Sequence, residues 1–195
     1  MITKFQNSQT AVNLMKAFAG ESQARNRYTY YSSVATKEGY VQISQIFAET
    51  ADHEKEHAKR FYKFLKDTFK GQMINIDSSF PVMLDGTLDN LKAAAAGEHE
   101  EWDDLYPSFA KTAREEGFDE IASVFEHVAI AESHHEARYK KLIKNIETQS
   151  VFVKSEEKHW KCLNCGYAQS GTAAPDKCPA CDHPQAYFAL LENTY

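Results

Sequence analysis

The sequence has no long apolar run and no excess of positive charge. No stretch approaches the roughly 18 consecutive apolar residues that mark a membrane-spanning helix, and residues 1–18 lack the apolar segment of a secretory signal. Lysine and arginine number 22 against 28 aspartate and glutamate residues, and the net charge is −6. No part of the chain supplies a basic patch, which argues against nucleic acid as the main partner. We therefore expect a cytoplasmic protein with neither membrane nor nucleic acid among its partners.

Cysteine is absent from the first 161 residues, which excludes a disulfide framework over most of the chain. A length of 195 residues allows one medium domain, or one domain and a small appendage. With 43% hydrophobic and 26% charged residues, the chain has the composition of a globular protein that buries a core.

What the sequence does contain is a Glu-x-x-His pattern that occurs twice, 78 residues apart. Positions i and i+3 lie on one face of a helix, so each copy offers a carboxylate and an imidazole to the same metal ion. One such pair is usually a solvated surface feature, but a pair duplicated in register favours metal ligands. Each copy follows a further glutamate in a helical stretch, and the resulting set is Glu21, Glu54, His57, Glu98, Glu132 and His135. Four carboxylates and two imidazoles are the ligands of ferritin-like di-metal four-helix bundles.

Apolar residues at helical spacing predict four helices, over residues 8–37, 40–68, 88–114 and 118–147. Residues 69–86 contain glycine, proline and small polar residues, so we expect a long crossover connection between two helical hairpins. Pro107 interrupts the pattern of the third helix and predicts a kink or an irregular turn there.

The two halves of this helical region are an internal repeat. The Ala-Gly-Glu sequence that ends at Glu21 recurs at Glu98, an offset of 77 residues, whereas Gly39 recurs as Gly117 at an offset of 78. The second half therefore gains one residue between its first glutamate and its glycine turn. In the first hairpin the two ligand glutamates lie about 27 and 22 Å from the turn, at a helical rise of about 1.5 Å per residue. The ligands are thus expected in one layer of the bundle.

The composition changes after residue 150. The sequence at 151–153 predicts an extended entry, and two Cys-x-x-Cys pairs follow, made of Cys162, Cys165, Cys178 and Cys181. About 45 residues bury too little apolar surface to fold alone, so a metal ion is expected to stabilise this part. Four thiolates provide a tetrahedral site for zinc or for a single iron ion, and the spacing does not distinguish them. We predict two domains, residues 1–150 and 151–195.

Seven stretches carry a resemblance to a known family: AFAGESQARNRY (17–28), IFAETADHEKEHAKR (46–60), AAGEHEEW (95–102), AREEGF (113–118), AIAESHHEAR (129–138), WKCLNCGY (160–167) and CPACDHP (178–184). They resemble rubrerythrins, in the form with a ferritin-like bundle first and a rubredoxin-like module last. The resemblance implies a di-iron centre held by the six ligands above and by Glu101, with Glu54 and Glu132 as bridges. It also implies one iron ion on the four cysteines, hence three iron ions per chain. Tyr28 and Tyr106 match tyrosines beside the family's ligands, and the role of Trp102, where family members often have tyrosine, stays open.

The resemblance further implies a peroxide reductase. The diferrous centre would reduce hydrogen peroxide to water, and electrons would return through the four-cysteine iron, supplied ultimately by NAD(P)H through a separate reductase or rubredoxin. We expect a head-to-tail homodimer or a higher oligomer, because the tail begins about 27 Å along a helix from Glu132. Ferric iron prefers anionic oxygen and ferrous iron accepts imidazole, so one iron is expected to exchange Glu101 for His57 with oxidation state.

The alternative is a ferritin-like iron storage or ferroxidase protein with a structural zinc tail, and an oxygen-activating hydroxylase is a third interpretation. Zinc is also able to occupy either site in recombinant protein. The other histidines are expected to matter less. His53, His99 and His134 lie one or two positions from a ligand and are expected in solvent or beside the ligands. His183 is expected on the surface or hydrogen-bonded near the four cysteines.

Overall fold

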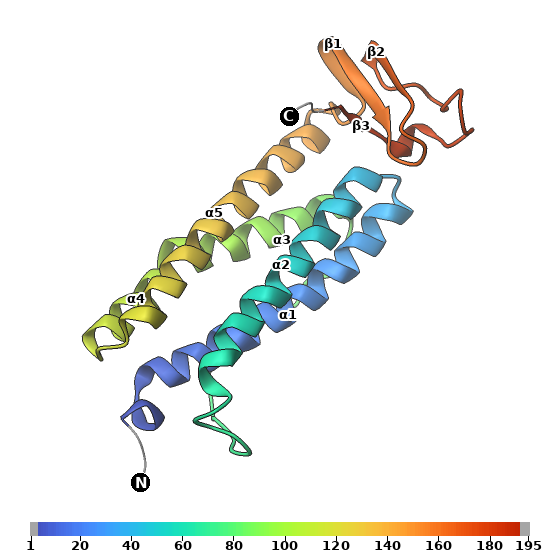
Figure 1. Cartoon of the computed structure of the whole chain (residues 1–195). Coiled ribbons are helices and arrows are strands. Elements are labelled where there is room, and N and C mark those ends of the chain that lie inside the picture. The colour runs from blue at the N-terminus through green and yellow to red at the C-terminus, as the bar shows by residue number, and fades with distance from the viewer. Residues whose placement is uncertain (1–3, 192–195) are drawn as a thin grey trace.

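The computed structural model describes residues 4–191 as a long helical bundle with a small β-sheet at one end (Figure 1). The helices are α1 (Gln9–Lys37), α2 (Val41–Leu65), α3 (Thr87–Glu100), α4 (Tyr106–Glu115) and α5 (Asp119–Glu147), with a π-helix at Glu101–Leu105 and 3-10 helices at Phe5–Asn7 and Gln185–Tyr187. The strands are β1 (Val153–Cys162), β2 (Ala168–Ala173) and β3 (Phe188–Leu190). Across these described residues, no helix is both long and apolar enough to cross a membrane. The predicted mainly helical, ferritin-like architecture is confirmed, and α3, the π-helix and α4 together form the third helix of the four.

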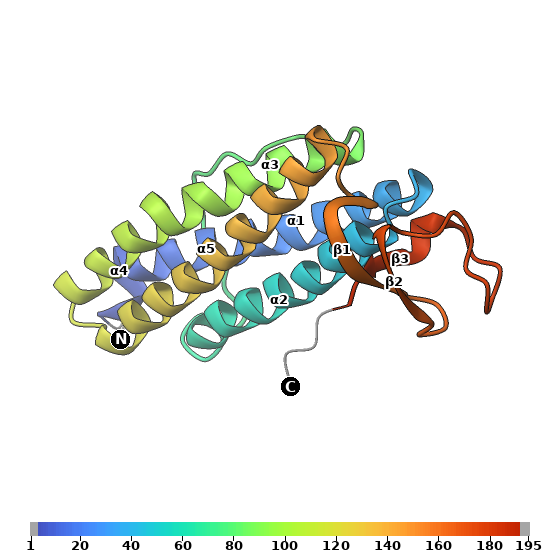
Figure 2. The same ribbon diagram turned by 90° about the horizontal axis from the view of Figure 1, so that it is seen from above.

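Two helical hairpins build the bundle, and each turns at a glycine. α1 contacts α2, and α5 contacts α3 and α4. Gly39 and Gly117 have φ angles of 84° and 79°, a left-handed conformation that glycine adopts without a Cβ clash. The segment between α2 and α3 runs back along the bundle, as predicted (Figure 2). The Tyr31 hydroxyl donates a hydrogen bond of 3.0 Å to the carbonyl of Met83 in this segment, which ties it to α1.

The apolar core has two parts, with the predicted ligands between them. The first cluster includes Leu14, Phe61, Tyr106 and Phe125, and the second includes Tyr31, Phe47, Leu91 and Tyr139. Along α1, Glu21 lies one turn after Ala17 of the first cluster and one turn before Ala24 of the second. The carboxylate layer is therefore enclosed by apolar layers, where an uncompensated charge is costly.

The third helix of the bundle is irregular directly before Pro107. Residues Glu101–Leu105 form a π-helix, and the backbone N–H of Tyr106 donates to the carbonyl of Glu101, five residues earlier. Because Pro107 has no N–H, it cannot donate a backbone hydrogen bond to the preceding turn. A π-turn directly before Pro107 therefore costs few hydrogen bonds compared with a regular α-helix. A π-turn holds one residue more than an α-turn. This accounts for the single residue that the second half of the repeat gains.

The C-terminal module is a three-stranded antiparallel sheet in the order β2-β1-β3. Its small core includes Trp160, Cys162, Cys178 and Phe188. The 3-10 helix at Gln185–Tyr187 and β3 contact α2, and Phe152 stacks on Tyr40 with ring centroids 6.3 Å apart. The module therefore lies at the Gly39 end of the bundle. The domain division predicted at residue 150 falls in the turn between α5 and β1.

Candidate di-metal centre and four-cysteine site

The bundle brings six of the predicted ligands into two overlapping groups. One ligand atom each from Glu21, Glu54, His57 and Glu132 lies within 4.8 Å of the others, and the same holds for Glu54, Glu98, Glu132 and His135. Glu54 and Glu132 belong to both groups. The residues come from four different helices, so only the assembled bundle creates this arrangement.

The two shared glutamates lie between the two histidines. Glu54 places Oε2 at 3.0 Å from Nδ1 of His57 and Oε1 at 3.3 Å from Nδ1 of His135. Glu132 places Oε1 at 2.9 Å and Oε2 at 2.8 Å from the same two nitrogens. Glu98 completes the His135 side at 3.3 Å, and Glu21 lies 3.9 Å from His57. Each shared carboxylate therefore places one oxygen beside each histidine, an arrangement that would offer one oxygen to each of two metal ions.

The donor atoms of this layer fit bound cations. Glu21 Oε2 is buried and has no hydrogen-bond partner within residues 4–191, while Glu54 Oε1 and both carboxylate oxygens of Glu132 face the nitrogens of the two histidines without forming a hydrogen bond to them. Buried carboxylate oxygens without partners are strongly destabilising, and a coordinated metal ion removes that cost. Oxygen and imidazole donors together suit iron, and also zinc or manganese.

The electrostatics of the layer show how it is neutralised when no metal is bound. Burial raises the pKa of the Glu98 carboxyl to about 8 and that of Glu21 well above its usual range. Burial works in the opposite direction on the imidazoles, yet the neighbouring carboxylates raise the pKa of His57 to about 10 and of His135 to about 12. The same contacts lower the pKa of Glu54 to about 2 against the effect of burial. Protons and metal ions thus compete for the same atoms.

Glu21 and Glu98 each belong to only one of the two ligand groups, and each accepts a hydrogen bond from a tyrosine of the other half of the repeat, Tyr106 and Tyr28 respectively. The Tyr28 hydroxyl donates to Glu98 Oε1 at 2.7 Å, and the Tyr106 hydroxyl donates to Glu21 Oε1. Tyr28 follows Glu21 by seven residues, whereas Tyr106 follows Glu98 by eight. The extra residue lies in the π-helix, which keeps Tyr106 in register with its counterpart.

Glu101 lies outside both groups. Its partly buried side chain lines a cavity of about 330 Å³ between α1, the π-helix and the connection before α3. Its Oε1 lies 4.0 Å from where a Cβ on Gly20 would be, beside Glu21. Burial and then the neighbouring carboxylates raise its pKa, while Arg27 in the same cavity opposes that shift. In this structure His57, and not Glu101, contacts the shared glutamates.

Three contacts of Glu136 beside the layer were not identified from the sequence. Glu136 is buried and accepts a hydrogen bond of 2.9 Å from Nε1 of Trp102, with Nδ1 of His99 at 3.3 Å and Nζ of Lys140 at 2.5 Å. Trp102 thereby joins the π-helix to α5. In the sequence, the only indication of these contacts is position: Glu136 directly follows the predicted ligand His135, and Trp102 directly follows Glu101.

Of the histidines expected in solvent or beside the ligands, His53 and His134 represent one case each. His53 lies beside a ligand, with Nδ1 at 3.1 Å from Nε2 of His135. His134 is exposed. Both line a cavity of about 680 Å³ between α2 and α5 that reaches His57 and His135. The centre is therefore approached from two sides, through this cavity and through the one at Glu101.

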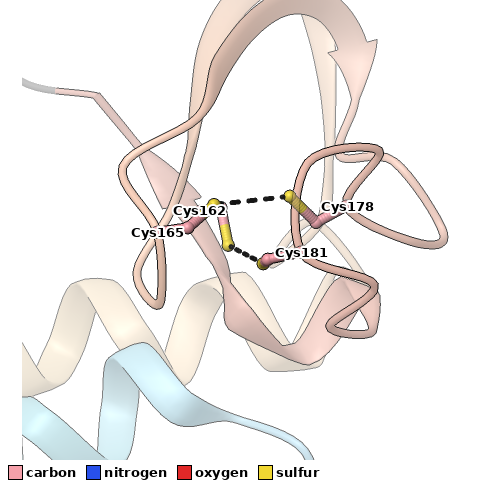
Figure 3. A group of neighbouring side chains, drawn as sticks. All are labelled: Cys162, Cys165, Cys178 and Cys181. Carbon is pink, nitrogen blue, oxygen red and sulfur yellow. Dashed lines mark hydrogen bonds between the residues drawn. The ribbon is translucent and has the colours of Figure 1, made fainter.

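The four cysteine side chains point toward a common centre (Figure 3). The sulfur atoms of Cys162 and Cys181 are 3.7 Å apart, as are those of Cys165 and Cys178, and all four lie within 4.8 Å of one another. A tetrahedron with metal–sulfur bonds of about 2.3 Å has edges of about 3.8 Å, so the cluster fits one metal ion. The backbone N–H of His183 lowers the pKa of the Cys181 thiol to about 6. Nδ1 of His183 also contacts the Cys181 carbonyl at 3.0 Å, so this histidine lies near the site.

Comparisons with known proteins match both parts of the chain. The family profile described as rubrerythrin matches residues 13–143, and the profile described as rubrerythrin, rubredoxin-like domain matches residues 160–189. A protein named rubrerythrin from Clostridium perfringens is 60% identical over 189 residues, which are 96% of this chain and 97% of that protein. The solved structure of nigerythrin in a partially reduced state is 31% identical and covers 97% of this chain and 94% of its own, with a TM-score of 0.64. A bacterioferritin from Rhodobacter capsulatus shares the fold at 19% identity and a TM-score of 0.64, over 72% of this chain and 86% of its own.

These matches agree with the two metal-binding clusters that the geometry defines. They imply a di-iron centre in the bundle and a metal ion on the four cysteines. Because the similarity extends over nearly the whole of both chains, the resemblance noted in the sequence is confirmed: the chain belongs to the rubrerythrin family of peroxide-reducing di-iron proteins.

Proposed function

We propose that this chain reduces hydrogen peroxide to water at a di-iron centre in the bundle. The observation that carries the proposal is the pair of overlapping ligand sets that share Glu54 and Glu132. Glu54 and Glu132 would hold two metal ions between them, and such a pair of ions would supply the chemistry for reducing one peroxide. The reaction consumes one peroxide, two electrons and two protons, and it releases two waters.

The side chains of the layer have distinct parts in this proposal. Glu21 and Glu98 act as terminal ligands, and each accepts a hydrogen bond from a buried tyrosine. Burial raises the pKa of Tyr28 and of Tyr106 well above the usual range, so both phenols keep their protons and remain donors. Glu101, which lines its own cavity, is a further ligand available to the Glu21 side. When bound, the two iron ions supply the two electrons that cleave the oxygen–oxygen bond.

A second candidate metal site, on the four cysteines, favours turnover over storage. A one-electron iron ion on the four cysteines is useful beside a centre that must be re-reduced, and it has no use beside an iron store. The module packs at the Gly39 end of its own bundle, and the helix from Gly39 to Glu54 spans about 22 Å at about 1.5 Å per residue. A module from a second chain would offer a shorter route, which favours a head-to-tail homodimer. We also propose that NAD(P)H supplies the electrons through a separate reductase or rubredoxin in the cytoplasm.

Visible absorption of the iron-reconstituted protein tests the proposal. We expect a thiolate-to-iron charge-transfer spectrum that a reductant bleaches and that hydrogen peroxide restores. Glu54→Ala should keep the spectrum and lose the rapid recovery with peroxide, whereas Glu56→Ala, an exposed neighbour on α2, should behave like the unsubstituted chain. A colourless four-cysteine site, together with ferric iron accumulating beyond the capacity of the two sites, would contradict the proposal and support ferritin-like storage.

A further inference from the structure

The ring of His135 is held at both nitrogens. Its Nδ1 faces the carboxylates, with Glu132 at 2.8 Å, and its Nε2 lies 3.1 Å from Nδ1 of His53. The two rings stack with centroids 5.3 Å apart and planes inclined by 12°. A nitrogen that coordinates a metal carries no proton, so Nε2 of His135 is the protonated one and donates to His53. Ligand histidines are commonly oriented by a partner of this kind at the second nitrogen.

His57 is the counterpart of His135 in the internal repeat, but it has no such partner. Residue 131 corresponds to His53 at the offset of 78, and it is alanine. Ala131 and His57 line the same cavity, and a methyl group accepts no hydrogen bond. Within residues 4–191 no hydrogen bond reaches Nε2 of His57, whose Nδ1 contacts the shared glutamates as that of His135 does.

A second departure from the repeat affects the same side of the centre. Glu101 corresponds at the offset of 77 to Ala24, so only one half of the repeat carries a spare carboxylate. That carboxylate lies near Gly20, the neighbour of Glu21 in α1. The spare ligand and the unrestrained histidine are therefore both found at the metal position of Glu21 and His57.

We infer that His53 is a positioning residue that fixes His135, and that alanine at position 131 leaves His57 free to leave its metal ion. Of the two metal positions, the one held by Glu21 and His57 then exchanges a ligand, and the one held by Glu98 and His135 does not. The statement about ligand exchange rests on the proposed function, in which Glu101 is a further ligand on the Glu21 side, and on the exchange of His57 for Glu101 predicted from the sequence. The statement that His53 positions His135 rests only on the contact between these two residues.

Proton NMR of the cobalt(II)-loaded protein tests the contact without any redox step, because cobalt shifts the ring N–H protons of its histidine ligands out of the main spectrum. We expect one resonance for each ligand histidine, with the N–H of His135 exchanging with solvent more slowly than that of His57. His53→Ala should abolish the difference and weaken cobalt binding at that position by about 10- to 100-fold, the usual effect of losing such a partner. His53→Gln, whose amide oxygen accepts a hydrogen bond, should preserve slow exchange. His134→Ala, an exposed neighbour in the same cavity, is the matched control.

Ala131→His tests the second statement by giving His57 the partner that it lacks. Both ring N–H protons should then exchange slowly, and crystals of the oxidised and reduced protein should keep His57 bound in both states. Equal exchange rates in the His53→Ala and unsubstituted proteins would overturn the role of His53. Movement of His57 in an Ala131→His protein whose His57 N–H is slow would overturn the explanation of which metal position exchanges. If His57 stays bound in both oxidation states of the unsubstituted protein, the exchange itself is wrong, while the NMR result on His53 is unaffected.

Discussion

Metal loading of the metal-free protein is expected to release protons from the di-metal layer. Neighbouring carboxylates raise the pKa of His57 to about 10 and of His135 to about 12, and burial raises that of Glu98 to about 8. All three groups therefore hold protons near neutral pH when no metal is present. A coordinating imidazole nitrogen or carboxylate must give its proton up, so binding and proton release are coupled.

The size of the release follows from these values. At pH 7 the two histidines each hold one proton, and a carboxyl of pKa about 8 is about nine-tenths protonated, so the three groups together release about three protons. At pH 9 Glu98 retains about one-tenth of a proton and His57 about nine-tenths, so the release falls to about two. Burial also raises the pKa of Glu21 and Glu101, and any proton that these carboxyls give up adds to the release.

Isothermal titration calorimetry with zinc, in two buffers of different ionisation enthalpy, measures the protons released. The four-cysteine site should be filled first, so that only the bundle responds. Glu56→Ala, which changes an exposed carboxylate on the same helix, should leave the number unchanged. A release of fewer than about one proton at pH 7, or no decrease toward pH 9, would refute the assignment of protons to the layer.

Three further predictions concern the two sites. Glu101→Ala should leave binding of divalent metal largely intact but impair the oxidised state, seen as slower turnover with peroxide; unchanged turnover would argue against its role as a ligand. A mixture of Cys162→Ser and Glu54→Ala chains should regain about a quarter of the unsubstituted activity, because random pairing makes half the dimers mixed and each keeps one of two routes. If the mixture never exceeds the two variants alone, the route between subunits is wrong. The unfolding temperature of the metal-free protein should fall as the pH rises from about 5 to 9. Its stability from His57 is complete below the unfolded pKa of about 6.5 and is lost toward about 10, and Glu98 acts in the same direction between about 4.5 and 8. Zinc-loaded protein should lack this slope, and a rising unfolding temperature in the metal-free protein would contradict the assignment.

The residues of both candidate metal clusters could be predicted from the sequence, except that Glu101, also expected as a ligand, lies outside them. A helix brings residues three apart onto one face whatever it packs against, so the sequence alone predicts that Glu54 and His57 face the same side. The internal repeat adds the register between the hairpins, including the single extra residue in the second half. Cysteines spaced as Cys-x-x-Cys likewise need only a local turn to present two thiols together.

How these units meet depends on the packing of the helices, which the sequence pattern does not specify. The extra residue became a π-turn because Pro107 lacks an N–H, and nothing in the spacing specified that form. Whether His57 or Glu101 faces the shared glutamates depends on side-chain rotation across the helix interface. The partnership of His53 with His135 joins residues 82 positions apart, and it follows from the relative rotation and depth of α2 and α5. Helical periodicity constrains contacts within one helix, whereas contacts between helices depend on the packing of the whole bundle.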